Sequence, residues 1–461
     1  MHYIKRMLVI LFLAVFLVAC SSGPEEIVPD YVTEAENVTF GGATFTFMTG
    51  PDIIYDPDSL FGDIARQRVS EVSEKYDVNI VFNENSDIVY DLMLYVSSGI
   101  KPVDVMFSDP VVLRTQIRAN LLYPVDTFST GIDYKDTNKW GGREHLIGYA
   151  WNDHLYGLTA MYWPESVWRN IGYFFYVNEN IISRLNTPDP REYVENGEWT
   201  RDRYEQVLEE YTHQDNNGET VYALTAMPGH YFSMAIKASG IDYVVKQSNG
   251  KYTNAYLEPG ALDKLTWAYD SYWNNYEKTI THDTDTFTTI AQFVSGKAVM
   301  LLMEMYWGMR DVQYEVEDFG LLPFPLSDDL AGSKWIGQFE DLKKSMSFIA
   351  NIEETDALST VVNAIFEPLP GYETEEERYE YYDRYVFHDP RDTRLVFECV
   401  KNCRYIPYYD SGYLIPDAMR DAEGNRTISQ ILESNAKVMD NLYEKVYIPM
   451  YESCDSLWGE E

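Results

Sequence analysis

Cysteine is scarce in this chain of 461 residues, which has only Cys20, Cys399, Cys403 and Cys454. A small extracellular fold that depended on disulfides would contain many more. No cysteines and histidines are clustered at zinc-binding spacings, so we predict no metal site. Cys399 and Cys403 share one face of a predicted helix, which indicates a structural role. The sequence leaves the pairing of the last three cysteines open.

Basic residues are also few. The chain has 36 lysines and arginines against 74 aspartates and glutamates, which gives a formal net charge of −38. A surface this acidic repels phosphate backbones, so we predict no nucleic-acid partner. Acidity of this kind keeps a protein soluble, and by itself it does not indicate a cationic ligand.

Several enzyme motifs are missing. The sequence has no GxGxxG after its first predicted strand, no GxxxxGK[ST] phosphate-binding loop, no GxSxG and no HExxH. We therefore predict no catalytic residue and no cofactor. A glycoside hydrolase needs only two suitably spaced carboxylates, so a carbohydrate-active enzyme stays open as an alternative.

The one long apolar run lies at the N-terminus. Lys5 and Arg6 precede thirteen consecutive apolar residues, 7–19. This length fits the core of a signal peptide and is shorter than the ~20 residues that span a bilayer. The run ends in LVAC, which resembles the lipobox of bacterial lipoproteins. We expect residues 1–19 to be a signal peptide and Cys20 to carry the lipid.

The segment that follows Cys20 begins with SSGPEE, small and charged residues that cannot bury a core. We interpret residues 20–39 as a lipidated cysteine and a flexible tether. The protein is then expected on the outer face of the cell membrane, attached through its lipid alone. The rest of the chain is long enough for two or three domains or lobes.

The next part of the chain alternates strands with helices. Its strands are expected at 44–48, 78–82 and 103–107, in units of about thirty residues that predict a mainly parallel sheet. A second α/β region follows after about residue 160. Ligands bind beyond the carboxyl ends of parallel strands, and this rule selects Asp52 and Asp109.

Five segments resemble, in order, the sugar-binding family of bacterial extracellular solute-binding proteins, family 1, which includes the maltose-binding proteins. They are 103–110 (VDVMFSDP), 173–185 (YFFYVNENIISRL), 193–200 (YVENGEWT), 293–300 (FVSGKAVM) and 319–325 (FGLLPFP). The chain departs from the family at Glu179-Asn180, where a lysine is usual. The stretch after Phe366 does not align.

The resemblance implies a two-lobed periplasmic-binding-protein-like fold of type II. Each lobe is then a mainly parallel sheet flanked by helices, and the lobes are hinged by strands that cross near 155–160, 305–315 and 365–370. The predicted lobes are 40–157 plus 312–367 for the first and 158–311 plus 368–461 for the second.

A sugar ring has apolar faces and a rim of hydroxyls, so its site needs flat aromatics and a few carboxylates or amides. With 38 tyrosines and 10 tryptophans, the composition permits such a site. Trp307 stands where the family carries a sugar-stacking tryptophan, and Asp109 where it often bonds a hydroxyl. The other candidates are Asp52, Tyr162, Trp163, Glu304, Trp335 and Tyr408.

Each of these residues also has a structural interpretation. Trp307 competes with a core role, Asp109 with a helix N-cap, and Tyr162 and Trp163 with packing at the hinge. Trp335 lies in a polar loop, where an aromatic is more suggestive of binding. These alternatives cannot be separated by the sequence.

The resemblance implies a monomeric binder that closes on a carbohydrate, an oligosaccharide, and delivers it to the permease subunits of an ABC-type importer. Three alternatives stay open. The first is a secreted, lipid-anchored carbohydrate-active enzyme. The second is a binder of another solute such as a peptide, a polyamine or an amino acid, and the third is a surface scaffold lipoprotein.

Overall fold

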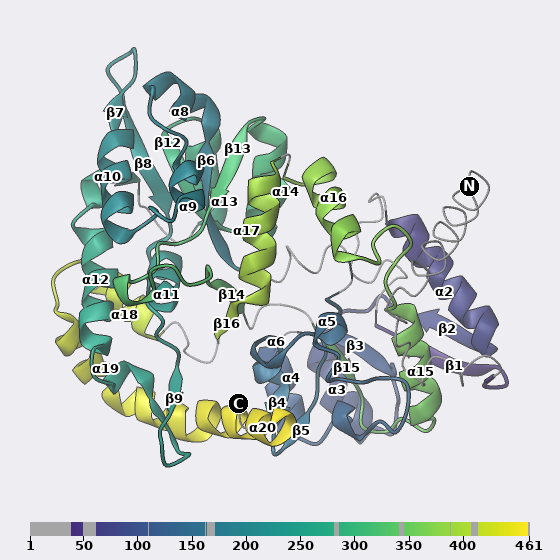
Figure 1. Cartoon of the computed structure of the whole chain (residues 1–461). Helices are drawn as coiled ribbons and strands as arrows, with labels where there is room; N and C mark the ends of the chain where they lie inside the picture. Colours follow the sequence, from purple (N-terminus) through teal and green to yellow (C-terminus); the bar gives the residue numbers. More distant parts are fainter. Residues whose placement is uncertain are drawn as a thin grey trace, which may run out of the picture.

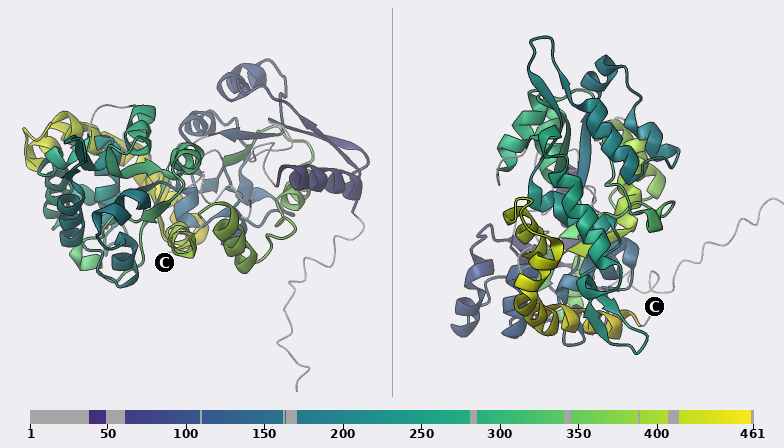
Figure 2. Two further views of the ribbon diagram at one scale, coloured as in Figure 1. Left: turned by 90° about the horizontal axis from the view of Figure 1, so that it is seen from above. Right: turned by 90° about the vertical axis from the view of Figure 1, so that its left-hand side faces the viewer.

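The chain forms two α/β lobes, each built around its own sheet and lying side by side (Figures 1 and 2). This computed structural model describes residues 38–48, 61–108, 110–161, 163, 171–280, 285–340, 345–387, 389–406 and 414–459. The predicted two-lobed α/β fold is confirmed. The signal peptide, Cys20 and most of the tether lie outside the described residues.

The first lobe contains a four-stranded sheet in the order β15-β3-β1-β2. The strands are β1 (Ala43–Phe47), β2 (Val78–Phe82), β3 (Val105–Ser108) and β15 (Ser345–Phe348). Strands β1, β2 and β3 are parallel, as predicted, and β15 returns antiparallel to β3.

Helices and short elements surround the first sheet. They are α2 (Gly62–Tyr76), α3 (Ile88–Ser97), α4 (Pro110–Arg118), η2 (Val125–Thr127), α5 (Thr137–Trp140), α6 (Arg143–Leu146), η3 (Ile147–Tyr149), β4 (Ala150–Trp151), β5 (His154–Leu155) and α15 (Thr355–Ile365). In α2 the buried positions Ala65, Val69, Val72 and Tyr76 recur every three or four residues, which is the spacing that places them on one face. The helix ends at Asp77, which takes a left-handed conformation.

The second lobe contains a larger sheet in the order β11-β8-β12-β6-β13, with β7 paired to β8. Its strands are β6 (Tyr173–Asn178), β7 (His213–Gln214), β8 (Thr220–Ala226), β11 (Thr279–Ile280), β12 (Ala298–Glu304) and β13 (Phe319–Leu322). All residues of β6 and β12 are buried, because each strand has a neighbour on both sides. The sheet is mixed rather than mainly parallel, since β6 runs antiparallel to both β12 and β13.

Eight helices and a hairpin complete the described core of this lobe. They are α8 (Glu179–Leu185), α9 (Pro190–Glu195), α10 (Arg201–Tyr211), α11 (Pro228–Ala238), the β9 (Val244–Lys246) and β10 (Tyr252–Asn254) hairpin, α12 (Ala261–Trp273), α13 (Thr286–Val294), α14 (Met305–Glu315) and α17 (Pro390–Lys401). Helix α16 (Glu375–Tyr385) contacts α17, and its Tyr381 ring meets Phe61 at the start of α2, so it lies between the lobes (Figure 1).

Near the junction, β14 (Gly337–Glu340) pairs in parallel with β16 (Cys403–Ile406). Gly172, just before β6, donates its N–H to the Gln338 carbonyl at 2.7 Å, which ties this ribbon to the start of β6. The C-terminal part comprises α18 (Leu414–Asp421), α19 (Ile428–Leu442), the π-helical turn η7 (Tyr443–Tyr447) and α20 (Ile448–Trp458).

The predicted lobe boundaries need correction. Strand β13 pairs with β6, so the chain is still in the second lobe at 319–322, and the boundary at 312 is too early. The crossing predicted near 305–315 is wrong for the same reason, because α14 packs on β12 and β6. The chain re-enters the first sheet only at β15. In the other direction, Leu158 bridges to Met346, so the first lobe extends beyond residue 157.

The C-terminal third is also not confined to the second lobe. Helix α20 contacts β4 and β5 of the first lobe, whereas α19 contacts α12 of the second. The prediction of 368–461 as a second-lobe segment is therefore wrong for α20. An amphipathic pattern shows which face of a helix is buried and does not show which lobe buries it.

Candidate functional site

The parallel strands of the second sheet bring three helix starts to one edge. Strands β11, β8 and β12 run in the same direction, with Ile280 beside Thr225 and Leu302 beside Ala226. After these strands come α13, α11 and α14 respectively. Because parallel strands end at the same edge, the first turns of these helices lie close together, and ligands of such sheets bind at this edge.

Two aromatic rings and a guanidinium meet at this edge. The ring centroids of Phe287, from the first turn of α13, and Trp307, from the first turn of α14, are 5.7 Å apart at 81°. The Arg310 guanidinium lies 4.3 Å from the centroid of Trp307 and 5.7 Å from that of Phe287. We call these three residues the aromatic corner.

The aromatic corner is open to solvent. Phe287 is 59% exposed and Trp307 is only partly buried, although large apolar side chains are usually inside. The Asp285 carboxylate accepts the Phe287 N–H at 3.1 Å and so fixes the start of α13. Exposed aromatic faces at a strand edge are suited to stacking on the apolar face of a ligand ring.

Polar groups lie on the same edge. Glu304 is the last residue of β12, is 6% exposed, and pairs across the sheet with Tyr173. His230, from the first turn of α11, has its ring 4.6 Å from that of Tyr173. Burial lowers the pKa of His230 to about 4, so its imidazole is neutral near pH 7. Carboxylate, phenol and neutral imidazole are groups that bond hydroxyls.

The predicted site residues are therefore brought together only in part. Trp307 and Glu304 lie at the same edge of the second sheet, and their binding roles stay predictions. Asp52, Asp109, Tyr162 and Tyr408 lie outside the described residues, and so does the lipidation candidate Cys20. Their predicted roles stay predictions.

Trp163 and Trp335 lie elsewhere. Trp163 is 1% exposed and its ring is 5.1 Å from that of Phe366, within the first-lobe core, which favours packing over binding. Trp335 is partly buried beside the β14–β16 ribbon. Its N–H donates to Glu398 at 2.7 Å and its carbonyl accepts from Asn402 at 3.0 Å.

Sequence reasoning missed Phe287, Tyr173 and His230. The signal for Phe287 and His230 was their place in the first helical turn after a parallel strand. Tyr173 opens a strand that runs antiparallel to β12, and no local pattern gives that direction. Strand pairing is therefore needed to bring Tyr173 to the edge.

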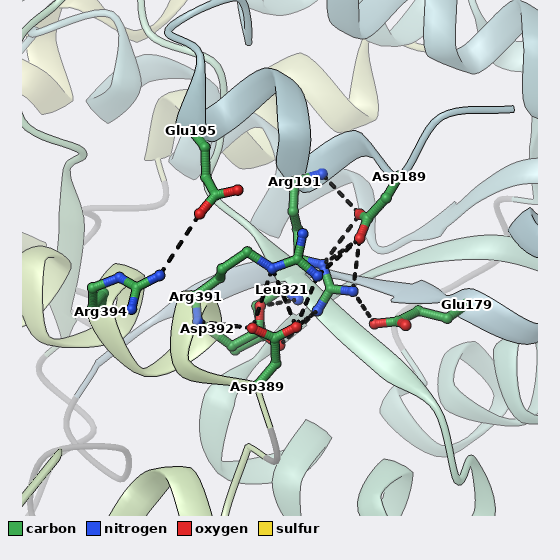
Figure 3. Close-up of polar contacts among 9 residues, drawn as sticks. All are labelled: Glu179, Asp189, Arg191, Glu195, Leu321, Asp389, Arg391, Asp392 and Arg394. Atoms are coloured by element: carbon green, nitrogen blue, oxygen red, sulfur yellow. Dashed lines mark hydrogen bonds and ion pairs between the residues drawn. The ribbon is translucent and has the colours of Figure 1, made fainter. Parts of the chain in front are cut away.

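A second polar cluster lies away from this edge and is centred on Arg191 (Figure 3). The Arg191 side chain is 4% exposed and contacts four carboxylates. Asp189 binds it at 2.9 Å, Asp389 at 3.1 Å and Asp392 at 3.2 Å, and Glu179 completes the set. We call these five residues the Arg191 cluster.

The Arg191 cluster joins three parts of the second lobe. Asp389 caps the start of α17, and Asp392 accepts the N–H of Leu321 in β13 at 3.0 Å. Gly320 lies directly on the guanidinium: an added Cβ would be 2.7 Å from its central carbon. The cluster therefore pins α17 to β13 and leaves no space for a substrate there.

Asp392 has the shifted pKa that an acid catalyst would need. Burial raises its pKa to about 8, with Asp389 and Glu179 adding to the rise, while Arg191 and the Leu321 N–H oppose it. Shifted carboxyls are often catalytic, but structural ion pairs shift pKa values in the same way. Because Asp392 is fully buried among its partners, we assign it a structural role.

Cys403 and His145 form a pair that could suggest a nucleophile and its base. The Cys403 sulfur lies 3.2 Å from His145 Nε2. However, Nδ1 accepts the Gly142 N–H at 3.1 Å, so the proton of the neutral ring is on Nε2 and the ring cannot accept one from the thiol. Burial also raises the pKa of Cys403 and lowers that of His145 to about 4. Both are inert structural groups.

The described residues also bear on a membrane span and on a metal site. None of the helices in these ranges is long and apolar enough to cross a membrane. Within the same ranges, no group of three or more His, Cys, Asp or Glu side chains could hold a metal ion.

Comparison of the sequence with protein-family models and with curated proteins found no match. Comparison of the fold with solved structures found many, and it defines the class as the type II periplasmic-binding fold. Structural neighbours across most of the chain are maltose-, maltodextrin- and other sugar-binding proteins of ABC transporters.

A cyclo/maltodextrin-binding protein complexed with maltotetraose has a TM-score of 0.60 at 14% identity, covering 88% of this chain and 98% of its own. The maltose-maltodextrin binding protein of Alicyclobacillus acidocaldarius has a TM-score of 0.54 at 14% identity, covering 86% of this chain and 100% of its own. UgpB from Mycobacterium tuberculosis, in complex with glycerophosphocholine, has a TM-score of 0.54 at 14% identity. The match covers 88% of this chain and 99% of UgpB. Likeness at this identity establishes the fold.

Replacing Arg191 should destabilise the protein strongly. Arg191→Met leaves the buried Asp392 and the partly buried Glu179 without their cation, although Arg391 still binds Asp189 and Asp389, so we expect the free energy of unfolding to fall by roughly 3–5 kcal/mol. Urea denaturation measures it. Arg394→Met is the matched control, because Arg394 and Glu195 are 60% and 50% exposed and 3.6 Å apart, and such a pair contributes less than about 1 kcal/mol. Equal losses of unfolding free energy in both variants would contradict the stabilising role assigned to the Arg191 cluster.

Stability should also depend on the protonation of Asp392. The folded protein holds this proton up to about pH 8, whereas an unfolded chain releases it near 3.8. The folded state is therefore favoured at low pH, and its stability falls as the pH rises through this window. Asp392→Asn should weaken that fall, as measured by urea titrations at pH 5, 6.5 and 8. Parallel pH profiles for both proteins would show that Asp392 does not titrate in this way.

Proposed function

We propose that this protein is a lipid-anchored, extracytoplasmic solute-binding protein that captures a carbohydrate, an oligosaccharide, between its lobes. It then delivers the ligand to the permease subunits of an ABC-type importer. The observation that carries the proposal is the aromatic corner, which lies at the strand edge where an open α/β sheet binds its ligand. Likeness of the whole fold to maltodextrin-binding structures supports the same ligand class.

The proposed recognition uses two kinds of contact. The faces of Trp307 and Phe287 stack on the apolar faces of sugar rings, and Glu304 and Tyr173 bond hydroxyls on the ring edge. Asp52 and Asp109, which follow strands of the first lobe in the sequence, are proposed to supply hydroxyl contacts from the other side. We keep Tyr162, Trp335 and Tyr408 as weaker candidates, and drop Trp163 because it is buried against Phe366.

The proposed mechanism is closure rather than catalysis. Ligand bound to one lobe makes further contacts when the other lobe swings over it, so the closed state is selected. The permease recognises that state. The monomeric state and the permease are expectations from the family resemblance.

Two alternatives are kept. A carbohydrate-active enzyme needs two carboxylates that face a substrate, and Asp392, which has the most suggestive pKa, is enclosed by Arg191. A non-sugar solute is the stronger alternative, because the similar UgpB structure holds glycerophosphocholine. Arg310 at the aromatic corner would favour a ligand with an anionic group, such as a phosphodiester, if that group replaced Asp311, which now accepts from Arg310 at 3.1 and 3.0 Å.

Ligand screening by thermal shift tests the proposal. We expect the lipid-free chain, residues 21–461, to be stabilised by one class of oligosaccharide. A ligand at ~100 times its Kd adds about 2.7 kcal/mol to the free energy of unfolding. Trp307→Ala and Phe287→Ala should each raise that Kd roughly 30-fold, since one stacking residue contributes about 2 kcal/mol.

Tyr276→Ala is the matched control for these variants. Tyr276 is 45% exposed and stacks on Trp273 at 5.6 Å, but it lies at the amino end of β11, on the opposite edge of the sheet. The Kd of Tyr276→Ala for the same oligosaccharide should equal that of the unmodified chain. Stabilisation only by peptides, polyamines or phosphodiesters would reject the sugar and keep the binding function. Glycan cleavage in the same samples would reject the binding function itself.

The proposed anchor has its own test. Cys20→Ala removes the thiol that would carry the lipid, so the protein should lose incorporation of labelled fatty acid in a bacterial host and leave the membrane fraction. Cys454→Ala is the control, because Cys454 is buried and should leave labelling unchanged. Fatty-acid labelling that persists without Cys20 would reject the assignment of the lipid to that residue.

A further inference from the structure

The C-terminal helices connect the two lobes without a crossing strand. Helix α19 packs on α12 and α18, the π-helical turn η7 follows without a break, and α20 then packs on β4 and β5 (Figure 1). We call α19, η7 and α20 together the C-terminal rod. This rod begins on the second lobe and ends on the first. Single π-helical turns inside helices are often found at functional positions.

The β9–β10 hairpin extends from the second lobe to the same rod. Its root belongs to the second lobe, because Ala255 donates to the Tyr243 carbonyl at 3.1 Å and α12 contacts the turn that follows. The Tyr243 ring is 5.4 Å from that of Tyr447 in the π-helical turn. Further out, the rings of Tyr252 and Tyr451 are 5.5 Å apart. The hairpin thus follows the rod as far as α20.

One carboxylate collects donors from both lobes at that point. Asp455 of α20 accepts from Lys246 at 2.8 Å and from Tyr252 at 2.8 Å, both on the hairpin. It also accepts from Arg143 of α6, in the first lobe, at 3.1 Å. These contacts are well shielded: the side chains of Asp455, Arg143 and Lys246 are only 18%, 19% and 30% exposed.

The charge of Asp455 is well stabilised. Burial alone would raise its pKa, but the hydrogen bonds from Lys246, Tyr252 and Arg143 outweigh this and hold it below its ordinary value. Arg143 also donates to the Tyr252 hydroxyl at 3.2 Å, so the first lobe contacts the hairpin directly. Without the carboxylate, the cations of Lys246 and Arg143 would face each other across the junction.

We propose that Asp455 is an electrostatic latch between the lobes, which holds the β9–β10 hairpin of the second lobe against α20 and α6 of the first. The latch restricts the angle between the lobes and so biases any opening or closing motion. It lies apart from the aromatic corner, and its existence does not depend on what the protein binds. Its influence on ligand affinity does rest on the proposed function.

Distance measurements between the lobes test the latch without a ligand. Spin labels at Ser97→Cys on α3 and Glu210→Cys on α10 lie on exposed positions of the first and second lobe. The natural cysteines 399, 403 and 454 are buried and escape labelling. Pulsed electron spin resonance then gives the distribution of interlobe distances in the lipid-free chain.

Asp455→Asn should change that distribution. Loss of hydrogen bonds to a charged group shifts a two-state equilibrium by about tenfold, so the distances should broaden or gain a second population. Lys246→Gln should shift the distribution in the same direction but less, because Tyr252 still donates to Asp455 from the hairpin. In the double variant the two effects should not add fully, because both changes act on the same cluster of contacts. Asp329→Asn is the control: its partner Lys264, at 2.6 Å, lies in the same lobe, so the distribution should not change.

The outcomes are distinct. An unchanged distribution in folded Asp455→Asn, or in Lys246→Gln if the former does not fold, overturns the latch. A change shared by Asp329→Asn also overturns it, because the effect would then be general loss of charge. Once a ligand is known, its Kd should change in Asp455→Asn while the aromatic corner is intact. Failure of every ligand to bind would count against the proposed function and leave the distance result standing.

Discussion

A single buried guanidinium, that of Arg191, holds the late part of the chain on the second lobe. Its carboxylate partners Asp389 and Asp392 lie 198 and 201 residues further along the chain. A charge removed from water is costly unless it is paired, and here four carboxylates surround the guanidinium, Gly320 leaves room for it, and the Leu321 N–H donates to its partner Asp392. Helix α17 packs on β13 and β14, so the ribbon near the junction is positioned through the same interaction.

The Arg191 cluster and the aromatic corner, which we propose as the binding surface, are separate regions of the second lobe. The Arg191 cluster is enclosed and satisfied, whereas the aromatic corner, on helices α13 and α14, leaves Phe287 59% exposed. Exposed apolar side chains that cluster, as Phe287 and Trp307 do, mark interaction surfaces, whereas single exposed ones are common. The junction between the lobes forms a third region. There Asp455 of α20 contacts the β9–β10 hairpin and α6, which are far apart in the chain. Rigid lobes joined by adjustable contacts are what a closing protein requires.

Much of the first lobe could be predicted because its signals are local. Strands expected at 44–48, 78–82 and 103–107 are found at 43–47, 78–82 and 105–108, and β1, β2 and β3 are parallel as expected. Sheet membership was harder. The apolar sequence of residues 319–322 predicts a strand but does not show which lobe contains it. Only the pairing of this strand with β6 assigns it to the second lobe.

The site shows the same division between local and distant signals. Trp307 follows an apolar strand and could be placed at a strand end. Trp163 was an equally plausible binding aromatic in the sequence, but in the structure it is buried against Phe366. Composition and spacing cannot distinguish a tryptophan that faces solvent from one that faces a core. The partners of Asp455 lie 203, 209 and 312 positions away, so no local pattern could have indicated that contact.

The most direct test of the account is to ask which molecules the protein retains, and in what form. The lipid-free chain would be incubated with a mixture of oligosaccharides, peptides and phosphodiesters, separated from unbound compounds by gel filtration, and denatured to release what it holds for mass spectrometry. The account predicts that one class of oligosaccharide is recovered in near-stoichiometric amounts and intact. Recovery of shortened glycans would indicate an enzyme, and recovery of only peptides or phosphodiesters would contradict carbohydrate capture.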